Sequence, residues 1–131
     1  DLDTVGPMSL AAELGDAWRS WCNPAGEDDP SNARFDFILY EASVKGFMET
    51  APALLPEEWE NLAPGIERIC LELSARFCAD ALNNSYFKED RSVFPTPGTH
   101  NLHKARCQLA LARSVRAHRS QCEALIASFR A

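Results

Sequence analysis

The amino-acid sequence predicts an all-α fold, and three observations support this class. The chain has 131 residues, of which 46% are hydrophobic and 24% are charged, as is typical of one globular domain. Apolar residues recur at every third or fourth position in several segments, which is the spacing of an amphipathic helix. No segment has a convincing strand pattern. We therefore expect a single helical domain over residues 1–131.

The first two helices are predicted from their start and stop signals. Residues 1–7 are rich in turn-forming residues and are expected to form a loop. A short helix should follow over about residues 16–22, with Asp16 placed to cap its free backbone N–H groups. After a polar loop, a second helix is predicted over about residues 37–50, with Asp36 as its cap.

The longest apolar pattern predicts a central third helix over about residues 57–83. Its proline at the start is favourable, whereas Pro64-Gly65 should break the helix and restart it. The restarted part carries one apolar stripe, formed by Ile66, Ile69, Cys70, Leu73, Phe77 and Ala81.

A polar loop and one further helix complete the predicted fold. The loop, residues 84–100, is long enough to suggest a binding loop or a mobile insertion. The last helix is predicted over about residues 102–129. Its inward positions are expected to be Leu109, Ala112, Cys122, Leu125, Ile126 and Phe129.

Charge is distributed unevenly along the chain. The net charge is −6, but residues 1–60 carry 13 acids against 3 bases, and residues 61–131 carry 6 acids against 10 bases. The net acidity argues against non-specific binding to nucleic acid or anionic lipid. Basic residues of the last helix leave two interpretations open: a solvated or docking surface for the acidic half, or a contact for RNA or DNA. These residues are Lys104, Arg106, Arg113, Arg116, Arg119 and Arg130.

The sequence also predicts a cytoplasmic protein with no membrane partner and with reduced thiols. No window approaches the ~20 apolar residues of a membrane-spanning helix, and the start lacks a secretory signal pattern. The five cysteines are odd in number and form no C-x-x-C pair, which argues against a disulfide framework and a zinc site. Cys70, Cys78 and Cys122 occupy apolar helical positions. His103 and Cys107 could share a metal, but two ligands do not make a site.

Two carboxylates near the start are candidate metal ligands. Asp1 and Asp3 lie two positions apart in a predicted turn, and Mg²⁺ prefers carboxylate oxygens together with phosphate oxygens. By spacing alone the pair is weak evidence for a metal site, because D-x-D occurs by chance in many loops.

A family resemblance adds to this interpretation. Asp1-Leu2-Asp3-Thr4 and Leu14-Gly15-Asp16-Ala17, with Arg19, resemble the metal loop and following helix of phosphotransferases related to aminoglycoside and choline kinases. The pattern is most similar to the N-acetylhexosamine 1-kinase-like sugar kinases. It continues in order through Lys45-Gly46-Phe47, Pro56-Glu57-Glu58, Leu71-Glu72, Arg76-Phe77, Asp80, Tyr86-Phe87-Lys88, His100-Asn101-Leu102, Arg106 and Gln108-Leu109.

The resemblance implies a fold and a set of residue roles. The chain would form the helical C-terminal subdomain, or C-lobe, of a protein-kinase-like phosphotransferase. Asp1 would hold the catalytic Mg²⁺ that accompanies ATP, and Asp3 would assist it. Asp16 would brace the active-site loops, while Arg76 and Tyr86 would line the pocket for a small-molecule acceptor.

Each acceptor residue also has a simpler interpretation. Arg76 could pair with Asp80, four residues further along the helix. Tyr86 could merely anchor the loop that contains it. The family pattern has one residue more between Arg76 and Tyr86, and residues 89–99 look longer than usual.

The sequence lacks other parts that phosphoryl transfer requires. The nucleotide cradle, the phosphate-binding lysine and the H-x-D-x-x-x-x-N catalytic loop of such enzymes are absent from these 131 residues. The first residue is Asp1 rather than methionine, directly at the metal loop. We therefore expect the C-terminal part of an enzyme that transfers a nucleotide γ-phosphate to a sugar or small-alcohol hydroxyl. No catalytic residue lies in this chain, which should be inactive alone and should need an N-terminal half.

An alternative hypothesis is a stand-alone helical binding or dimerisation module without catalysis. The polarised charge and the apolar surface that a missing lobe would leave uncovered favour a protein partner or a second copy of the chain.

Overall fold

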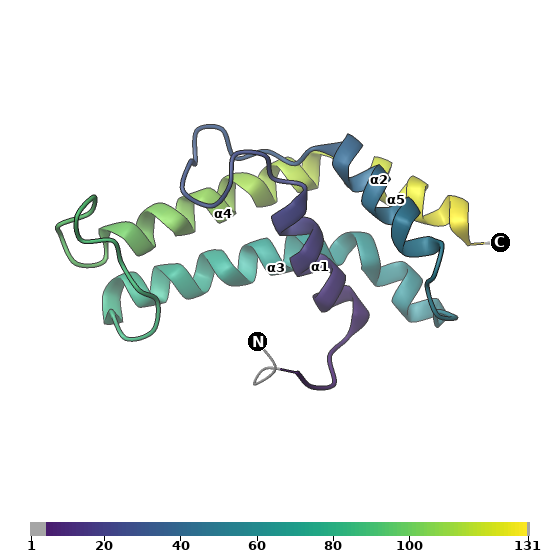
Figure 1. Cartoon of the computed structure of the whole chain (residues 1–131), viewed down its shortest axis with the longest axis horizontal. Coiled ribbons are helices and arrows are strands. Elements are labelled where there is room, and N and C mark those ends of the chain that lie inside the picture. The colour runs from purple at the N-terminus through teal and green to yellow at the C-terminus, as the bar shows by residue number, and fades with distance from the viewer. Residues whose placement is uncertain (1–4, 131) are drawn as a thin grey trace.

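The computed structural model describes residues 5–130, and within that range it contains five helices and no strand. The predicted all-α class is therefore confirmed. The helices, shown in Figure 1, are α1 (Leu10–Trp21), α2 (Phe37–Met48), α3 (Pro56–Asn83), α4 (Thr99–Ala117) and α5 (Arg119–Phe129).

Two long helices form the centre of the fold. Figure 1 shows α3 and α4 side by side along the long axis of the molecule, with α1 crossing α3 and with α2 and α5 at one end. Of the apolar stripe predicted for α3, Ile66, Cys70 and Phe77 are buried, whereas Ile69, Leu73 and Ala81 are half-buried. The largest apolar side chains of the core include Trp18, Tyr40, Leu62, Ile66 and Leu111.

Helix α1 begins earlier than the sequence predicted. It starts at Leu10 rather than near residue 16, and Ser9 is its N-cap, accepting a hydrogen bond from the N–H of Ala12 at 3.3 Å. The predicted capping role of Asp16 is therefore wrong, because Asp16 lies inside the helix. Gly15 does not mark a helix start either. Its missing side chain lets the backbone of α1 pack closely against Gly65 of α3.

Helix α3 is continuous from Pro56 to Asn83, so the predicted break at Pro64-Gly65 is wrong. Proline removes one backbone donor and bends a helix, and Figure 1 shows that the first part of α3 runs at an angle to the rest. Gly65 lies directly against the carbonyl of Ala11 in α1. Tertiary packing therefore maintains the helix through a sequence that disfavours it.

The predicted last helix, residues 102–129, is divided in two. His118 separates α4 from α5 with φ −98° and ψ 3°, which is not helical. Its Nδ1 atom lies 2.8 Å from the carbonyl oxygen of Ser114, and its ring packs on Phe35 at 5.7 Å between centroids. At the other end, α4 starts at Thr99 because Gly98, with φ 78°, reverses the chain there.

The side chains predicted to face inward on the last helix differ in their burial. Ala112, Cys122 and Ile126 are buried as predicted, whereas Leu109 is exposed. The inward-facing prediction for Leu109 is therefore wrong, because the side of α4 that carries it faces away from α3 and the core. Four of the basic residues contact α3. Lys104 lies over the Phe77 ring, and Arg130 lies 3.9 Å from Glu60. Arg116 and Arg119 bind the buried Glu67, with nitrogen to oxygen distances of 2.7 and 2.8 Å.

All five cysteines are unpaired thiols, as the sequence predicted. Cys70 and Cys122 are buried in the core, and burial raises the pKa of each to about 12. Cys78 is exposed, so its predicted apolar environment is wrong. Within residues 5–130, no helix is long and apolar enough to cross a lipid bilayer.

Candidate functional site

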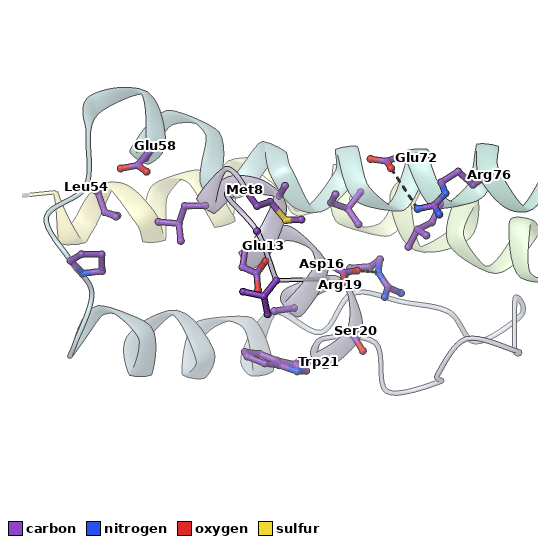
Figure 2. Close-up of a pocket in the computed structure, with 18 of the residues that line it drawn as sticks. Met8, Glu13, Asp16, Arg19, Ser20, Trp21, Leu54, Glu58, Glu72 and Arg76 are labelled. Atoms are coloured by element: carbon purple, nitrogen blue, oxygen red, sulfur yellow. Dashed lines mark hydrogen bonds and ion pairs between the residues drawn. The ribbon is translucent and has the colours of Figure 1, made fainter. Parts of the chain in front are cut away.

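An open cleft of about 1120 Å³ lies between α1, α3 and two connecting segments, residues 5–8 and 52–54. Figure 2 shows that its wall carries Asp16 on α1 and Arg76 on α3. The end of the predicted metal loop, residues 1–7, also borders the cleft, because Val5 and Gly6 line it. The charged residues of its lining are Glu13, Asp16, Arg19, Glu58, Glu72 and Arg76.

Arg76 connects this cleft with Tyr86. Its guanidinium lies 5.6 Å from the centre of the Tyr86 ring and 5.5 Å from that of Phe87, both within the range of cation–π attraction. Its ion-pair partner is Glu72, at 3.9 Å, so the alternative pairing with Asp80 is wrong. Among the described residues, Tyr86 does not line the cleft itself. It is 73% exposed and borders the cleft only through Arg76.

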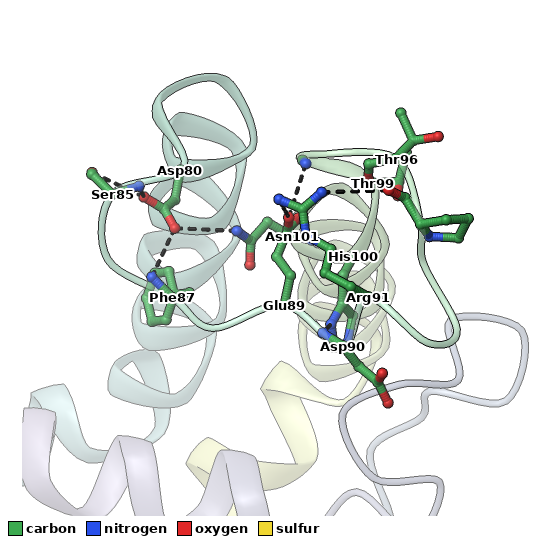
Figure 3. Close-up of polar contacts among 12 residues, drawn as sticks. Asp80, Ser85, Phe87, Glu89, Asp90, Arg91, Thr96, Thr99, His100 and Asn101 are labelled. Carbon is green, nitrogen blue, oxygen red and sulfur yellow. Dashed lines mark hydrogen bonds and ion pairs between the residues drawn. The ribbon is translucent and has the colours of Figure 1, made fainter.

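Asp80 is a buried carboxylate that holds the chain after α3. It accepts hydrogen bonds from the backbone N–H groups of Ser85, Tyr86 and Phe87 at 2.9, 3.0 and 2.7 Å. It also accepts from the Ser85 hydroxyl and from Nδ2 of Asn101 in α4, the latter at 3.1 Å (Figure 3). The N–H of Ser85 and its neighbours hold the pKa of Asp80 below its usual range, although burial opposes them.

Glu89 is a second carboxylate anchor in the same loop. Its side chain is 2% exposed and lies 3.0 Å from the guanidinium of Arg91. The N–H groups of Gly98 and Asn101 donate to it at 3.1 and 3.4 Å. Burial raises the pKa of Glu89, but these N–H groups outweigh it and hold the pKa below its usual range. Figure 3 shows Glu89 between the two arms of the loop.

His100 fastens the outer part of the loop. Its Nδ1 accepts from the N–H of Asp90 at 2.8 Å, and its ring stacks on Phe94 with centroids 4.5 Å apart. Its Nε2 lies 3.2 Å from Asp28, in the connection between α1 and α2. This set of contacts argues against a mobile insertion at residues 84–98.

Asp16 takes part in a short ion-pair chain. Its carboxylate lies 2.8 Å from Nε of Arg19, and Nη1 of Arg19 lies 2.8 Å from Glu27. The Arg19 side chain is 9% exposed, whereas that of Asp16 is 60% exposed. Asp16 therefore helps a buried arginine to hold the connection between α1 and α2, beside the cleft.

The predicted metal ligands Asp1 and Asp3 lie outside the described residues. Within residues 5–130, no group of three or more His, Cys, Asp or Glu side chains is arranged to hold a metal ion. The nitrogen Nε2 of His103 lies 2.7 Å from the carbonyl oxygen of Asp28, and Cys107 is buried.

Sequence reasoning did not identify Asp80, Glu89 and Asn101 as anchors of the loop. One signal was present for Asp80: an acid in the last turn of a helix faces the negative end of the helix dipole. Such a residue is stable when other N–H groups neutralise it, as they do here. No comparable local signal marks Glu89, because its partners lie across the loop.

The sequence matches no known protein-family model.

Proposed function

We propose that this chain is the acceptor-binding helical part of a kinase-like phosphotransferase that phosphorylates a sugar or small-alcohol hydroxyl. The observation that carries the proposal is the meeting of Arg76 and Tyr86 beside a cleft. Asp16 and the described end of the predicted metal loop, Val5 and Gly6, border the same cleft. These are residues that the family resemblance singles out, although they are far apart in the sequence.

The chemistry of the two acceptor residues suits a polyol. A guanidinium offers five N–H donors and no acceptor, while a phenol hydroxyl can both donate and accept. Sugar hydroxyls can pair with both groups. Because the Tyr86 side chain is largely exposed, its hydroxyl and ring are open to a ligand.

The roles of the remaining site residues follow from their positions. Asp16 acts through Arg19, which holds the connection between α1 and α2 beside the cleft. Asp1 and Asp3 would hold Mg²⁺ with ATP, whose charge the metal neutralises. The base that receives the acceptor proton and the nucleotide cradle would come from residues outside this chain.

Titration of the 131-residue chain with N-acetylglucosamine tests the proposal. We expect saturable chemical-shift changes at the Arg76 side-chain N–H and at Tyr86 in two-dimensional NMR spectra. Arg76→Ala should raise the Kd about tenfold, because a hydrogen bond to a charged group contributes about 1.5 kcal/mol. Arg68→Ala is the matched control, since Arg68 is an exposed arginine of the same helix outside the cleft.

A second arm of the experiment uses ATP with Mg²⁺. The proposal expects neither tight nucleotide binding nor steady turnover by this chain, because the nucleotide cradle is absent from its sequence. Micromolar binding of ATP in isothermal titration calorimetry, together with steady release of ADP, would overturn the proposal that the nucleotide site lies outside this chain.

A further inference from the structure

We infer that Asp80 is a positioning residue that sets where Tyr86 and Arg76 meet an acceptor. This inference rests on the proposed function for its biological meaning, but its geometry stands on contacts within the chain. Asp80 does not line the cleft, and it contacts Tyr86 through the backbone N–H rather than through the side chain. It therefore acts through the backbone of residues 85–87.

The chain reverses sharply after α3 so that its N–H groups face Asp80. Asn84 ends the helix with φ 50° and ψ 46°, in the left-handed region. The next three backbone N–H groups all point at one carboxylate, as they would around a bound anion. The side chain therefore fills this concave arrangement of donors and fixes the path of residues 85–87.

The position of Tyr86 depends on this backbone rather than on burial. Its side chain is 73% exposed, so packing alone supplies little to hold it. The neighbouring Phe87 is fixed, because its ring packs on Phe77 of α3 with centroids 4.3 Å apart. Tyr86 meets the Phe87 ring edge-on at 4.8 Å, and Arg76 lies over both rings. Asp80 thus determines how the side chains of Arg76, Tyr86 and Phe87 are placed relative to one another.

Asn101 connects Asp80 to α4 by a hydrogen bond. Its Nδ2 donates to Asp80, whereas its buried Oδ1 has no protein hydrogen-bond partner. A buried acceptor without a partner is unfavourable. The rotated amide would instead point its oxygen at the carboxylate, which is worse, so the contact with Asp80 dictates the orientation of Asn101 (Figure 3).

The test compares Asp80→Asn with Asp90→Asn in the complete 131-residue chain. Both changes remove one negative charge in or beside the loop, but Asp90 is exposed and its carboxylate bonds only within its own turn, to Ser92 and the Val93 N–H. The readout is the Arg76 Nε–H chemical shift, which ring currents of Tyr86 and Phe87 displace. We expect Asp80→Asn to abolish most of this displacement, and Asp90→Asn to leave it unchanged.

Amide hydrogen exchange and sugar binding complete the experiment. In Asp80→Asn, the amides of Tyr86 and Phe87 should exchange at least tenfold faster, while the central amides of α3 keep their protection. The Kd for N-acetylglucosamine should rise about as much as in Arg76→Ala. Asn101→Ala, which removes one donor to Asp80, should show the same changes in part.

The outcomes separate this inference from the proposed function. A folded Asp80→Asn variant with an unchanged Arg76 signal overturns the positioning role. If Asp80→Asn does not fold, Asn101→Ala decides: a shifted Arg76 signal supports the role, and an unchanged signal overturns it. If the Arg76 signal moves as expected but the unmodified chain shows no sugar binding, the geometry holds and the proposed acceptor function fails.

Discussion

Gly65 illustrates at the residue scale how little space separates α1 from α3. A Cβ at this position would collide with the carbonyl of Ala11, which is backbone and cannot rotate away. Gly46 offers a matched contrast in the exposed part of α2, because a Cβ there would meet nothing within 4 Å. The fold therefore requires a glycine at position 65 but has room for a side chain at position 46.

This contrast gives a prediction about stability. Gly65→Ala should lower the free energy of unfolding by about 1–3 kcal/mol or more, because forced overpacking displaces α1. Gly46→Ala should raise it by about 0.5–1 kcal/mol, since alanine favours the helix over glycine. Urea unfolding followed by circular dichroism measures both. A Gly65→Ala protein as stable as the unmodified chain would contradict the close packing of α1 on α3.

At the element scale, the loop of residues 84–98 depends on ionised carboxylates. Hydrogen bonds hold the pKa values of Asp80 and Glu89 below their usual ranges in the folded chain. A group whose pKa is lowered by folding stabilises the folded form fully above its unfolded pKa, about 4. This contribution is lost as the pH falls through the lower folded pKa.

We therefore expect acid to release the loop before the helices. Below about pH 4, the amides of Tyr86, Phe87 and Gly98 should lose protection from hydrogen exchange, after correction for the intrinsic pH dependence. The amides of Gln108 and Leu111 in the middle of α4, away from these carboxylates, serve as the internal reference. If the loop and helix amides lose protection at the same pH, the loop does not open as a separate unit that depends on its carboxylates.

The elements also show how much the sequence could predict. Apolar periodicity correctly predicted the all-α class and the burial of Ile66, Cys70 and Phe77 in α3, because both follow from local spacing. It failed at Gly15, Pro64 and His118, whose behaviour depends on contacts with distant segments. Tertiary packing maintained α1 and α3 through residues that disfavour helices, and it ended α4 without a glycine or proline.

In the candidate site too, some residues could be predicted from the sequence and others depend on contacts between distant segments. Arg76 and Tyr86 were identified through residue pattern, and the structure brings them into contact. The groups that hold them, Asp80 and Asn101, are recognisable only when the end of α3 and the start of α4 are seen together. Glu89 is likewise recognisable only in the folded structure, because its hydrogen-bond donors lie on the far arm of the loop.

At the scale of the whole molecule, the association state separates the proposal from the alternative module. Large apolar side chains such as Ile38 and Leu82 are 77% and 88% exposed, on α2 and α3. Size-exclusion chromatography with light scattering measures whether they mediate pairing. A monomer of 14.5 kDa that binds the sugar is the expected result. A stable dimer that ignores the sugar would favour the dimerisation module.

The NMR titration with N-acetylglucosamine tests the central claim most directly, because it asks whether Arg76 and Tyr86 recognise an acceptor. We expect saturable chemical-shift changes confined to these residues and the cleft lining. Arg76→Ala should weaken the affinity about tenfold, and Arg68→Ala should leave it unchanged. Spectra that do not change up to saturating sugar, or changes that Arg76→Ala leaves intact, would contradict the claim.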